Sequence, residues 1–211
     1  VLGTKKIVEQ AIKKKVKHFI FASSGSVYGI KKEKKVTEEL SCVPISVYNK
    51  TKMIAERVLH SYASKIKIHC IRPATVCGFS PRMRLDVSVN MFVHQALKNK
   101  KITVFGGKQV RPNINIKDLV GVYIHFVKNP KINSGNYNAG FENLKILDIA
   151  NLVKLQIPCT INIIKKNNDP RSYRQDSGKL LKTGFKPRSN VKDAILDIKN
   201  KYKNKEIVLD E

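Results

Sequence analysis

The sequence contains no run of about 20 apolar residues, the length that a helix needs to cross a lipid bilayer, and so predicts no membrane span. Its four cysteines, at positions 42, 70, 77 and 159, form no Cys-x-x-Cys pair, and none lies at zinc-site spacing from a histidine. We therefore expect free thiols and no metal site. No typical signal peptide precedes the first amphipathic segment, so we expect a reducing, cytoplasmic location.

Acidic residues are also scarce: 16 Asp and Glu stand against 41 Lys and Arg, a formal net charge of +25. Such a balance is typical of proteins that bind nucleic acid or anionic membranes. Only eight of the basic residues are Arg, however, and the Lys are spread from Lys5 to Lys205 with no basic-aromatic repeat. Nucleic-acid readers favour Arg forks and aromatic stacking platforms. We therefore favour a general bias of composition and expect no specific nucleic-acid or membrane partner.

The chain has 211 residues, 42% of them hydrophobic, which is enough to bury a core and form one domain or slightly more. Apolar residues recur at helical spacing in some segments and form short unbroken runs in others. The pattern predicts helices over 2–16, 48–62, 87–97, 119–127, 146–155 and 191–202, and strands over 18–22, 66–71, 102–105, 113–116, 135–139 and 160–164. We expect Asp118 to cap the fourth helix. This alternation is typical of an α/β fold with a parallel sheet.

Tyr48 and Lys52 are four residues apart in a predicted helix, so their side chains lie on the same face. An ammonium group beside a phenol favours the phenolate, and such a tyrosine can remove a proton near neutral pH, which a phenol of pKa about 10 cannot do. The same spacing also occurs on ordinary exposed faces of Lys-rich helices. Here, however, the preceding strand ends in the hydroxyl-rich segment Ser23–Gly29, and ligands bind at such strand ends. The two segments together predict a site that removes a proton from an alcohol.

Ser23–Gly29, with the sequence SSGSVYG, and the motif Tyr48-x-x-x-Lys52 resemble the extended short-chain dehydrogenase/reductase family. Within it they resemble the NAD-dependent nucleotide-sugar epimerases and dehydratases of the UDP-glucose 4-epimerase type. The resemblance implies a partial Rossmann-type parallel sheet with flanking helices, plus a small mixed α/β substrate-binding part. Residues 1–85 and 117–150 would form the dinucleotide-binding domain, and 86–116 and 151–211 the substrate-binding part. It also implies a homodimer that forms through the first two helices.

The resemblance implies roles for individual residues as well. Tyr48 would be the catalytic base, Ser24 the hydroxyl that shares its proton, and Lys52 the group that binds the nicotinamide ribose. The backbone at Ala74, in the loop 72–78, would pass the nicotinamide, so Ser24, Tyr48, Lys52 and Ala74 are the expected cofactor contacts. The expected substrate contacts are Ser26, Thr75, Asn90, Arg111 and Arg171. Thr75 stands where the family has an asparagine that meets the substrate phosphate, and its hydroxyl has a shorter reach than an amide.

The family's Gly-x-x-Gly-x-x-Gly loop, which holds the cofactor pyrophosphate at a helix N-terminus, is absent from the sequence. The pair Gly106-Gly107 lies late in the chain, between short predicted strands. We therefore expect the chain to be part of a longer protein whose first third carries this loop. The expected cofactor is NAD, and the sequence leaves NADP open because the residue that reads the ribose would lie in that first third.

Family dehydratases carry an acidic residue just after the hydroxyl of the first motif, and it expels water from the sugar. Gly25 and Ser26 occupy these positions here, and neither can act as a general acid at neutral pH. The sequence thus favours an epimerase, in which hydride leaves a sugar carbon for NAD and returns to the other face. Two alternatives stay open: a dehydratase or reductase of the same family, and a binding protein on this fold without catalysis.

Overall fold

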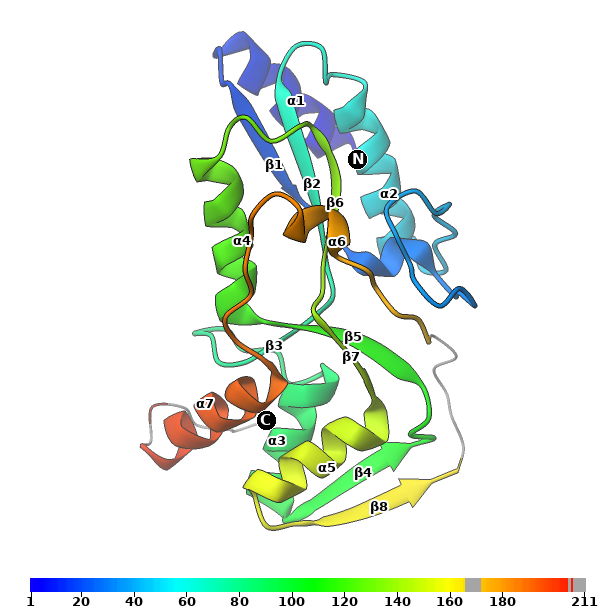
Figure 1. Ribbon diagram of the computed structural model, residues 1–211, viewed down its shortest axis with the longest axis vertical. Helices are drawn as coiled ribbons and strands as arrows, with labels where there is room; N and C mark the ends of the chain where they lie inside the picture. Colours follow the sequence, from blue (N-terminus) through cyan, green and yellow to red (C-terminus); the bar gives the residue numbers. More distant parts are fainter. Residues whose placement is uncertain (166–171, 205, 207–211) are drawn as a thin grey trace.

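The computed structural model describes residues 1–165, 172–204 and 206. It confirms an α/β architecture: a parallel sheet has helices on both faces, and a second group of short strands and helices continues from it (Figure 1). Within the described residues, no helix is both long enough and apolar enough to cross a membrane.

The main sheet contains β1 (His18–Ala22), β2 (Lys67–Pro73) and β6 (Gly135–Ala139), which are parallel and follow the order β1-β2-β6. Successive side chains of a strand point to opposite faces. On β2, Ile68 and Cys70 pack with α1 (Leu2–Lys13) and α2 (Val47–His60), whereas Ile71 packs with α4 (Ile116–Lys128) on the other face (Figure 1). Cover on both faces explains why this strand is buried from Ile68 to Arg72.

The second group contains two small sheets. One has the order β3-β5-β7, with β3 (Thr75–Cys77) parallel and β7 (Glu142–Lys145) antiparallel to β5 (Val110–Asn115). In the other, β4 (Lys101–Phe105) pairs in parallel with β8 (Thr160–Ile164). Only Ala74 separates β2 from β3, so the main sheet passes directly into this second group.

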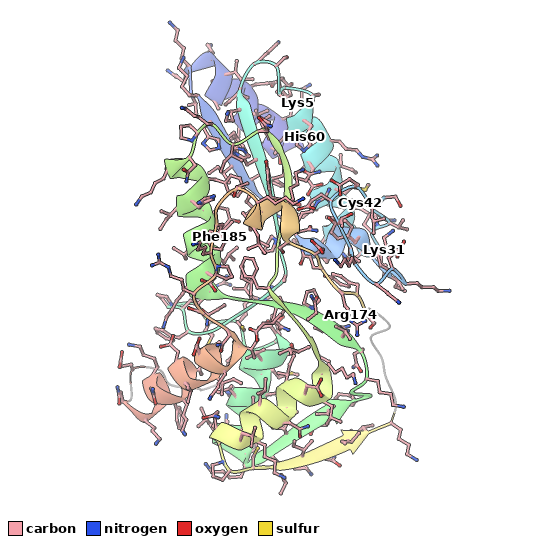
Figure 2. The ribbon with its side chains drawn as sticks, in the orientation of Figure 1. Lys5, Lys31, Cys42, His60, Arg174 and Phe185 are labelled. Atoms are coloured by element: carbon pink, nitrogen blue, oxygen red, sulfur yellow. The ribbon has the colours of Figure 1, made fainter. Side chains whose placement is uncertain are left out.

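Three helices cover the second group: α3 (Ser88–Asn99), α5 (Ile146–Gln156) and α7 (Val191–Lys203). Their buried side chains form one core with β4, and Phe92, Ile149 and Ile195 lie in it. The chain returns to the main sheet through α6 (Gly178–Leu181), after which Phe185 packs beside α4 and stacks on Phe141 at 5.7 Å between ring centroids (Figure 2). The division into domains by residue range stays a prediction.

The predicted helices and strands are confirmed, with ends that differ by a few residues. The prediction did not include β3, β7, α6 or the short 3-10 helix η1 (Gly25–Tyr28). These pieces are three or four residues long, which is too short for a helical or strand period to show in the sequence.

Two local predictions were wrong. The cap of α4 is Asn115, whose side chain accepts a hydrogen bond from the Lys117 backbone at 2.9 Å. Asp118 lies in the first turn and instead accepts hydrogen bonds from the backbone N–H groups of Arg188 and Ser189, at 2.9 and 3.0 Å. The first helix also ends at Lys13 rather than at residue 16.

Candidate active site

A cavity of about 420 Å³ lies at the carboxyl ends of β1 and β2, where the main sheet meets the second group. Its walls come from segments far apart in the sequence. They are formed by Ser23, Ser24, Ser26, Ser46, Tyr48, Asn49, Pro73, Ala74, Thr75, Val76, Arg84, Val87, Arg111 and Tyr173. Hydroxyl groups dominate this lining, two members are Arg, and none of the lining residues that the structure describes is acidic. The cavity therefore suits an anionic ligand that carries hydroxyl groups.

The hydroxyls of the first motif are held by the turn that follows β1. Ser24 is extended and caps η1, where its Oγ accepts a hydrogen bond from the Ser26 N–H at 3.2 Å. Gly29 ends η1 with φ 72°, and a Cβ on it would lie 2.0 Å from the Val43 carbonyl oxygen. Only glycine adopts that conformation without strain, so this residue fixes where the motif turns away from the cavity.

The second motif lies on the first turns of α2. Ser46 caps this helix and accepts a hydrogen bond from the Asn49 N–H at 3.2 Å. Tyr48 is 57% exposed and lines the cavity. One turn later the Lys52 ammonium lies 5.7 Å from the centroid of the Tyr48 ring. The helix therefore places the phenol and the ammonium on one face, as the spacing predicted.

Lys52 is held in place from the side of the sheet. Its Nζ donates a hydrogen bond to the carbonyl oxygen of Ala22 at 2.7 Å and lies 4.9 Å from the centroid of the Phe21 ring. Burial lowers the pKa of Lys52, because the ammonium loses part of its hydration. The end of β1 thus orients the cation that α2 brings to Tyr48.

A network of buried polar side chains lies next to the cavity. Arg72 on β2 forms a buried ion pair with Glu56 on α2 and donates a further hydrogen bond from Nη1 to the Tyr28 hydroxyl at 2.7 Å. Tyr28 in turn donates to Asn138 on β6 at 2.8 Å, and Ser23 donates to Glu56 at 2.5 Å. Burial raises the pKa of Tyr28, so this phenol stays protonated and donates. The network joins η1, α2 and the ends of all three strands of the main sheet.

Of the residues predicted from the motifs, the structure brings Ser24, Ser26, Tyr48, Ala74, Thr75 and Arg111 together around the cavity, with Lys52 beside Tyr48. Asn90 lies outside the lining and is 3% exposed. Its amide accepts from the Gly78 N–H and donates to the Arg84 carbonyl oxygen, each at 3.0 Å, which indicates that it braces the loop before α3. Arg171 lies outside the described residues. The catalytic and binding roles of all these residues stay predictions.

The lining residues that the sequence reasoning did not predict include Ser46, Asn49, Arg84 and Tyr173. Asn49 directly follows Tyr48. Its place in the first turn of that helix was a local sign that its amide could line the same cavity. Arg84 forms a two-point ion pair with Asp86, at 2.9 and 2.6 Å, on the loop before α3. Tyr173 reaches the cavity from a segment over 100 residues after α2, and no local pattern points to it. Among the described residues no three His, Cys, Asp or Glu gather as a metal site would require.

Comparison with known proteins identifies the family of this chain. Residues 1–140 match the NAD dependent epimerase/dehydratase family. The chain is 32% identical over 158 residues to an uncharacterized UDP-glucose epimerase, YtcB, of Bacillus subtilis (strain 168), which covers 73% of this chain and 49% of that protein. It is 31% identical over 207 residues to the UDP-glucose 4-epimerase of Lactobacillus helveticus, covering 85% of this chain and 62% of the relative. The matched part of the chain thus spans about half to two thirds of the length of these relatives.

Solved structures show the same fold. The UDP-glucuronic acid 4-epimerase from Bacillus cereus, in complex with UDP-glucuronic acid and NAD, superposes with a TM-score of 0.83 at 28% identity and covers 97% of this chain and 67% of that one. MoeE5, in complex with UDP-glucuronic acid and NAD, superposes with a TM-score of 0.83 at 22% identity over 98% of this chain and 71% of its own. With two thirds of its residues matched by one family, the chain belongs to the NAD-dependent epimerase/dehydratase family.

Proposed function

We propose that the protein is a nucleotide-sugar epimerase that uses NAD, and that the 211 residues are part of a longer polypeptide. One observation carries this proposal: Ser24 and Tyr48 line one cavity at the carboxyl ends of the parallel strands, and the Lys52 ammonium lies 5.7 Å from the centroid of the Tyr48 ring. A phenol beside an ammonium and a serine hydroxyl is the set needed to remove a proton from a sugar hydroxyl.

The residues present fit the nicotinamide half of NAD. Lys52 offers an ammonium group, Ser24 and Tyr48 offer hydroxyls, and Ala74 lines the same cavity as Ser24 and Tyr48. When bound, NAD would supply a hydride acceptor that later returns the hydride. The chain's own residues would bind and orient the sugar, and Tyr48 would take the hydroxyl proton and give it back.

The packing at Gly25 favours epimerisation over dehydration. A Cβ on this residue would lie 3.0 Å from the Pro73 carbonyl oxygen and 3.1 Å from the Gln175 side chain. An acidic side chain at this position would need the end of β2 to move. The neighbouring Ser26 is already hydrogen-bonded to Asn49, and a hydroxyl does not serve as a general acid for water loss at neutral pH.

We propose a UDP-hexose or UDP-hexuronate as the substrate. Arg84, on the loop before α3, and Arg111, on β5, both line the cavity. The guanidinium group of an arginine can bind a diphosphate with paired hydrogen bonds. Two similar proteins, a UDP-glucose 4-epimerase and a UDP-glucuronic acid 4-epimerase, support this class of substrate.

The test uses the protein expressed from its whole reading frame, with NAD and either UDP-glucose or UDP-glucuronic acid, and follows the 4-epimers by chromatography. Tyr48→Phe is expected to lower kcat by at least about 100-fold, because the base is removed. Tyr202→Phe makes the same change at a position on α7, 37% exposed, and should match the wild type.

Three other outcomes of this experiment would each contradict part of the proposal. A Tyr48→Phe variant with the wild-type rate would remove the assigned base. A 4-keto-6-deoxy product would show a dehydratase. Tight binding of UDP-glucose with no turnover would show the inactive binding protein on this fold.

We also propose that the protein forms a homodimer through α1 and α2. These helices pack side by side, and Leu2, Ile7 and Val47 are 77%, 60% and 77% exposed. Exposed apolar side chains on paired helices suit an interface with a second copy of the chain. Light scattering should report a dimer that Ile7→Lys shifts toward monomer, while Leu155→Lys on α5, where the side chain is 76% exposed, should not. A monomeric wild type would contradict this.

A further inference from the structure

Asn49 lies in the wall of the cavity with one branch of its side-chain amide already bound to protein. The residue is 4% exposed, and the Ser26 hydroxyl donates to its Oδ1 at 2.6 Å. Its backbone N–H donates to the side chain of Ser46, the cap of α2, at 3.2 Å. These contacts hold the amide against the turn η1, so its NH₂ branch points away from Ser26.

The NH₂ branch carries two protons, and within the described part of the chain neither has a protein acceptor. The nitrogen is not sealed in the interior, because Asn49 lines the cavity. Polar groups on residues this deeply buried are nearly always hydrogen-bonded. The free branch therefore suits a ligand that brings a hydrogen-bond acceptor into the cavity.

The place of Asn49 on α2 indicates which part of such a ligand it meets. Asn49 directly follows Tyr48, and consecutive Cα atoms are about 3.8 Å apart. Tyr48 is the base proposed for the hydroxyl on C4 of the hexose, so a donor beside it faces the hexose. The carbons next to C4 are C3, which bears a hydroxyl, and C5, which bears the C6 group.

We propose that Asn49 is a substrate-binding residue whose NH₂ group donates a hydrogen bond to an oxygen next to the reacting carbon, either the C3 hydroxyl oxygen or the oxygen at C6. The inference rests on the proposed epimerase function, which makes C4 the reacting carbon. Ser26 positions the amide by its bond to Oδ1. The contact recognises the sugar and not the nucleotide.

The test measures binding by isothermal titration calorimetry. It uses the full-length protein with NAD, and every variant also carries Tyr48→Phe so that no substrate turns over. Asn49→Ala should weaken binding of UDP-glucose by about 5- to 10-fold, the effect of one lost neutral hydrogen bond. The affinity for UDP, which has no hexose, should not change. Unchanged UDP binding also shows that the variant is folded.

Two further variants separate a ligand contact from a structural role. Asn49→Asp keeps an oxygen to which Ser26 can donate, but an ionised carboxylate has no proton to give. It should therefore weaken UDP-glucose binding at least as much as Asn49→Ala. Asn200→Ala removes an exposed amide from α7, away from the cavity lining, and should change nothing. Full UDP-glucose affinity in Asn49→Asp, or equal losses for UDP and UDP-glucose in Asn49→Ala, would overturn the inference.

Two substrate analogues identify the oxygen. UDP-3-deoxyglucose and UDP-6-deoxyglucose each lack one of the two hydroxyls. For the analogue without the hydroxyl that Asn49 binds, Asn49→Ala should cause no loss of affinity, because no bond is left to remove. Losses for both analogues as large as the loss for UDP-glucose would show that Asn49 contacts neither oxygen.

The outcomes also separate this inference from the proposed function. If Tyr48→Phe is inactive in turnover and Asn49→Ala leaves the UDP-glucose affinity unchanged, the contact is wrong and the epimerase proposal stands. If Tyr48→Phe turns over as fast as wild type, the proposed function fails, and this inference fails with it because it takes C4 as the reacting carbon.

Discussion

Arg72 donates two parallel hydrogen bonds to Glu56 beneath the cavity, from Nε at 2.9 Å and from Nη2 at 2.7 Å. Both side chains are almost fully buried, with 4% and 3% of their surface exposed. Two charges taken out of water are tolerated only when each has its partner in good geometry. This pair therefore ties α2, which carries Tyr48, to the end of β2, where the cavity begins.

The first prediction concerns this pair. Arg72→Met leaves the Glu56 carboxylate buried and unpaired, and should lower the free energy of unfolding by about 3–5 kcal/mol. Urea denaturation measures the change. Adding Glu56→Leu removes the carboxylate that Arg72→Met leaves unpaired. The double variant should therefore lose less free energy of unfolding than the sum of the losses in the two single variants. Arg84→Met breaks an ion pair whose side chains are 69% and 68% exposed, and should cost no more than about 1 kcal/mol. Equal losses for both Arg variants would contradict the prediction.

The second prediction concerns pH. His69 is fully buried, with Nδ1 2.6 Å from His18 Nε2 and Nε2 near the carbonyl oxygens of Ile132 and Asn133. Burial, with a smaller effect of His18, lowers the pKa of His69 from 6.5 to about 4. Because the unfolded chain binds this proton more readily, stability is retained above pH 6.5 and lost as pH falls toward 4.

The loss should reach roughly 3 kcal/mol at pH 4, since each pKa unit corresponds to about 1.4 kcal/mol. Urea denaturation at pH 7, 5.5 and 4.5 measures it. His69→Gln keeps a side-chain donor for the two carbonyl oxygens but does not titrate, so its stability should fall less steeply over this range. Parallel pH profiles for wild type and variant would refute the role of His69.

The third prediction concerns Gly29. Alanine there would need a Cβ 2.0 Å from the Val43 carbonyl oxygen, in a backbone conformation with φ 72°. Gly29→Ala should therefore destabilise the protein by about 2 kcal/mol or more. Gly3→Ala is the matched control, because nothing lies within 4 Å of its Cβ in α1, and it should be neutral or stabilising by up to about 1 kcal/mol. A Gly29→Ala variant as stable as wild type would show that the turn adapts.

The fourth prediction concerns the anion-binding side of the cavity. Arg111→Met should weaken binding of UDP by about 10- to 100-fold, the effect of losing a charge-assisted contact to phosphate. Isothermal titration of the full-length protein at low and high salt measures it. Arg57→Met removes an exposed charge from α2, away from the cavity lining, and should change affinity little. Equal affinities in both variants would remove Arg111 from the site.

Much of the local structure follows from residue order. The strand His18–Ala22 and the helix that begins near Tyr48 are visible as an apolar run and as a 3.6-residue period, because both patterns depend only on neighbours in the chain. The same holds for Tyr48 and Lys52, which share a helix face by their spacing. Their motif, with the serines after β1, was enough to indicate the family.

Asn90 shows what that reasoning leaves out. Its position in the motif pattern predicts a substrate contact, which stays a prediction, but gave no sign that its amide bonds to the Gly78 N–H and the Arg84 carbonyl oxygen. Hydrogen-bond partners of a buried amide depend on what packs around it, and that cannot be taken from a spacing.

The sequence alone determined the kind and order of the elements and the two motifs, since these depend on local periodicity and residue type. Tertiary structure decided that β6 lies next to β2, that Arg72 meets Glu56 and that Tyr173 reaches the cavity. Arg72 and Glu56 are 16 positions apart, but Ser23 and Tyr173, which line the same cavity, are 150 positions apart (173 − 23). Only the packing of a shared core brings such distant segments together.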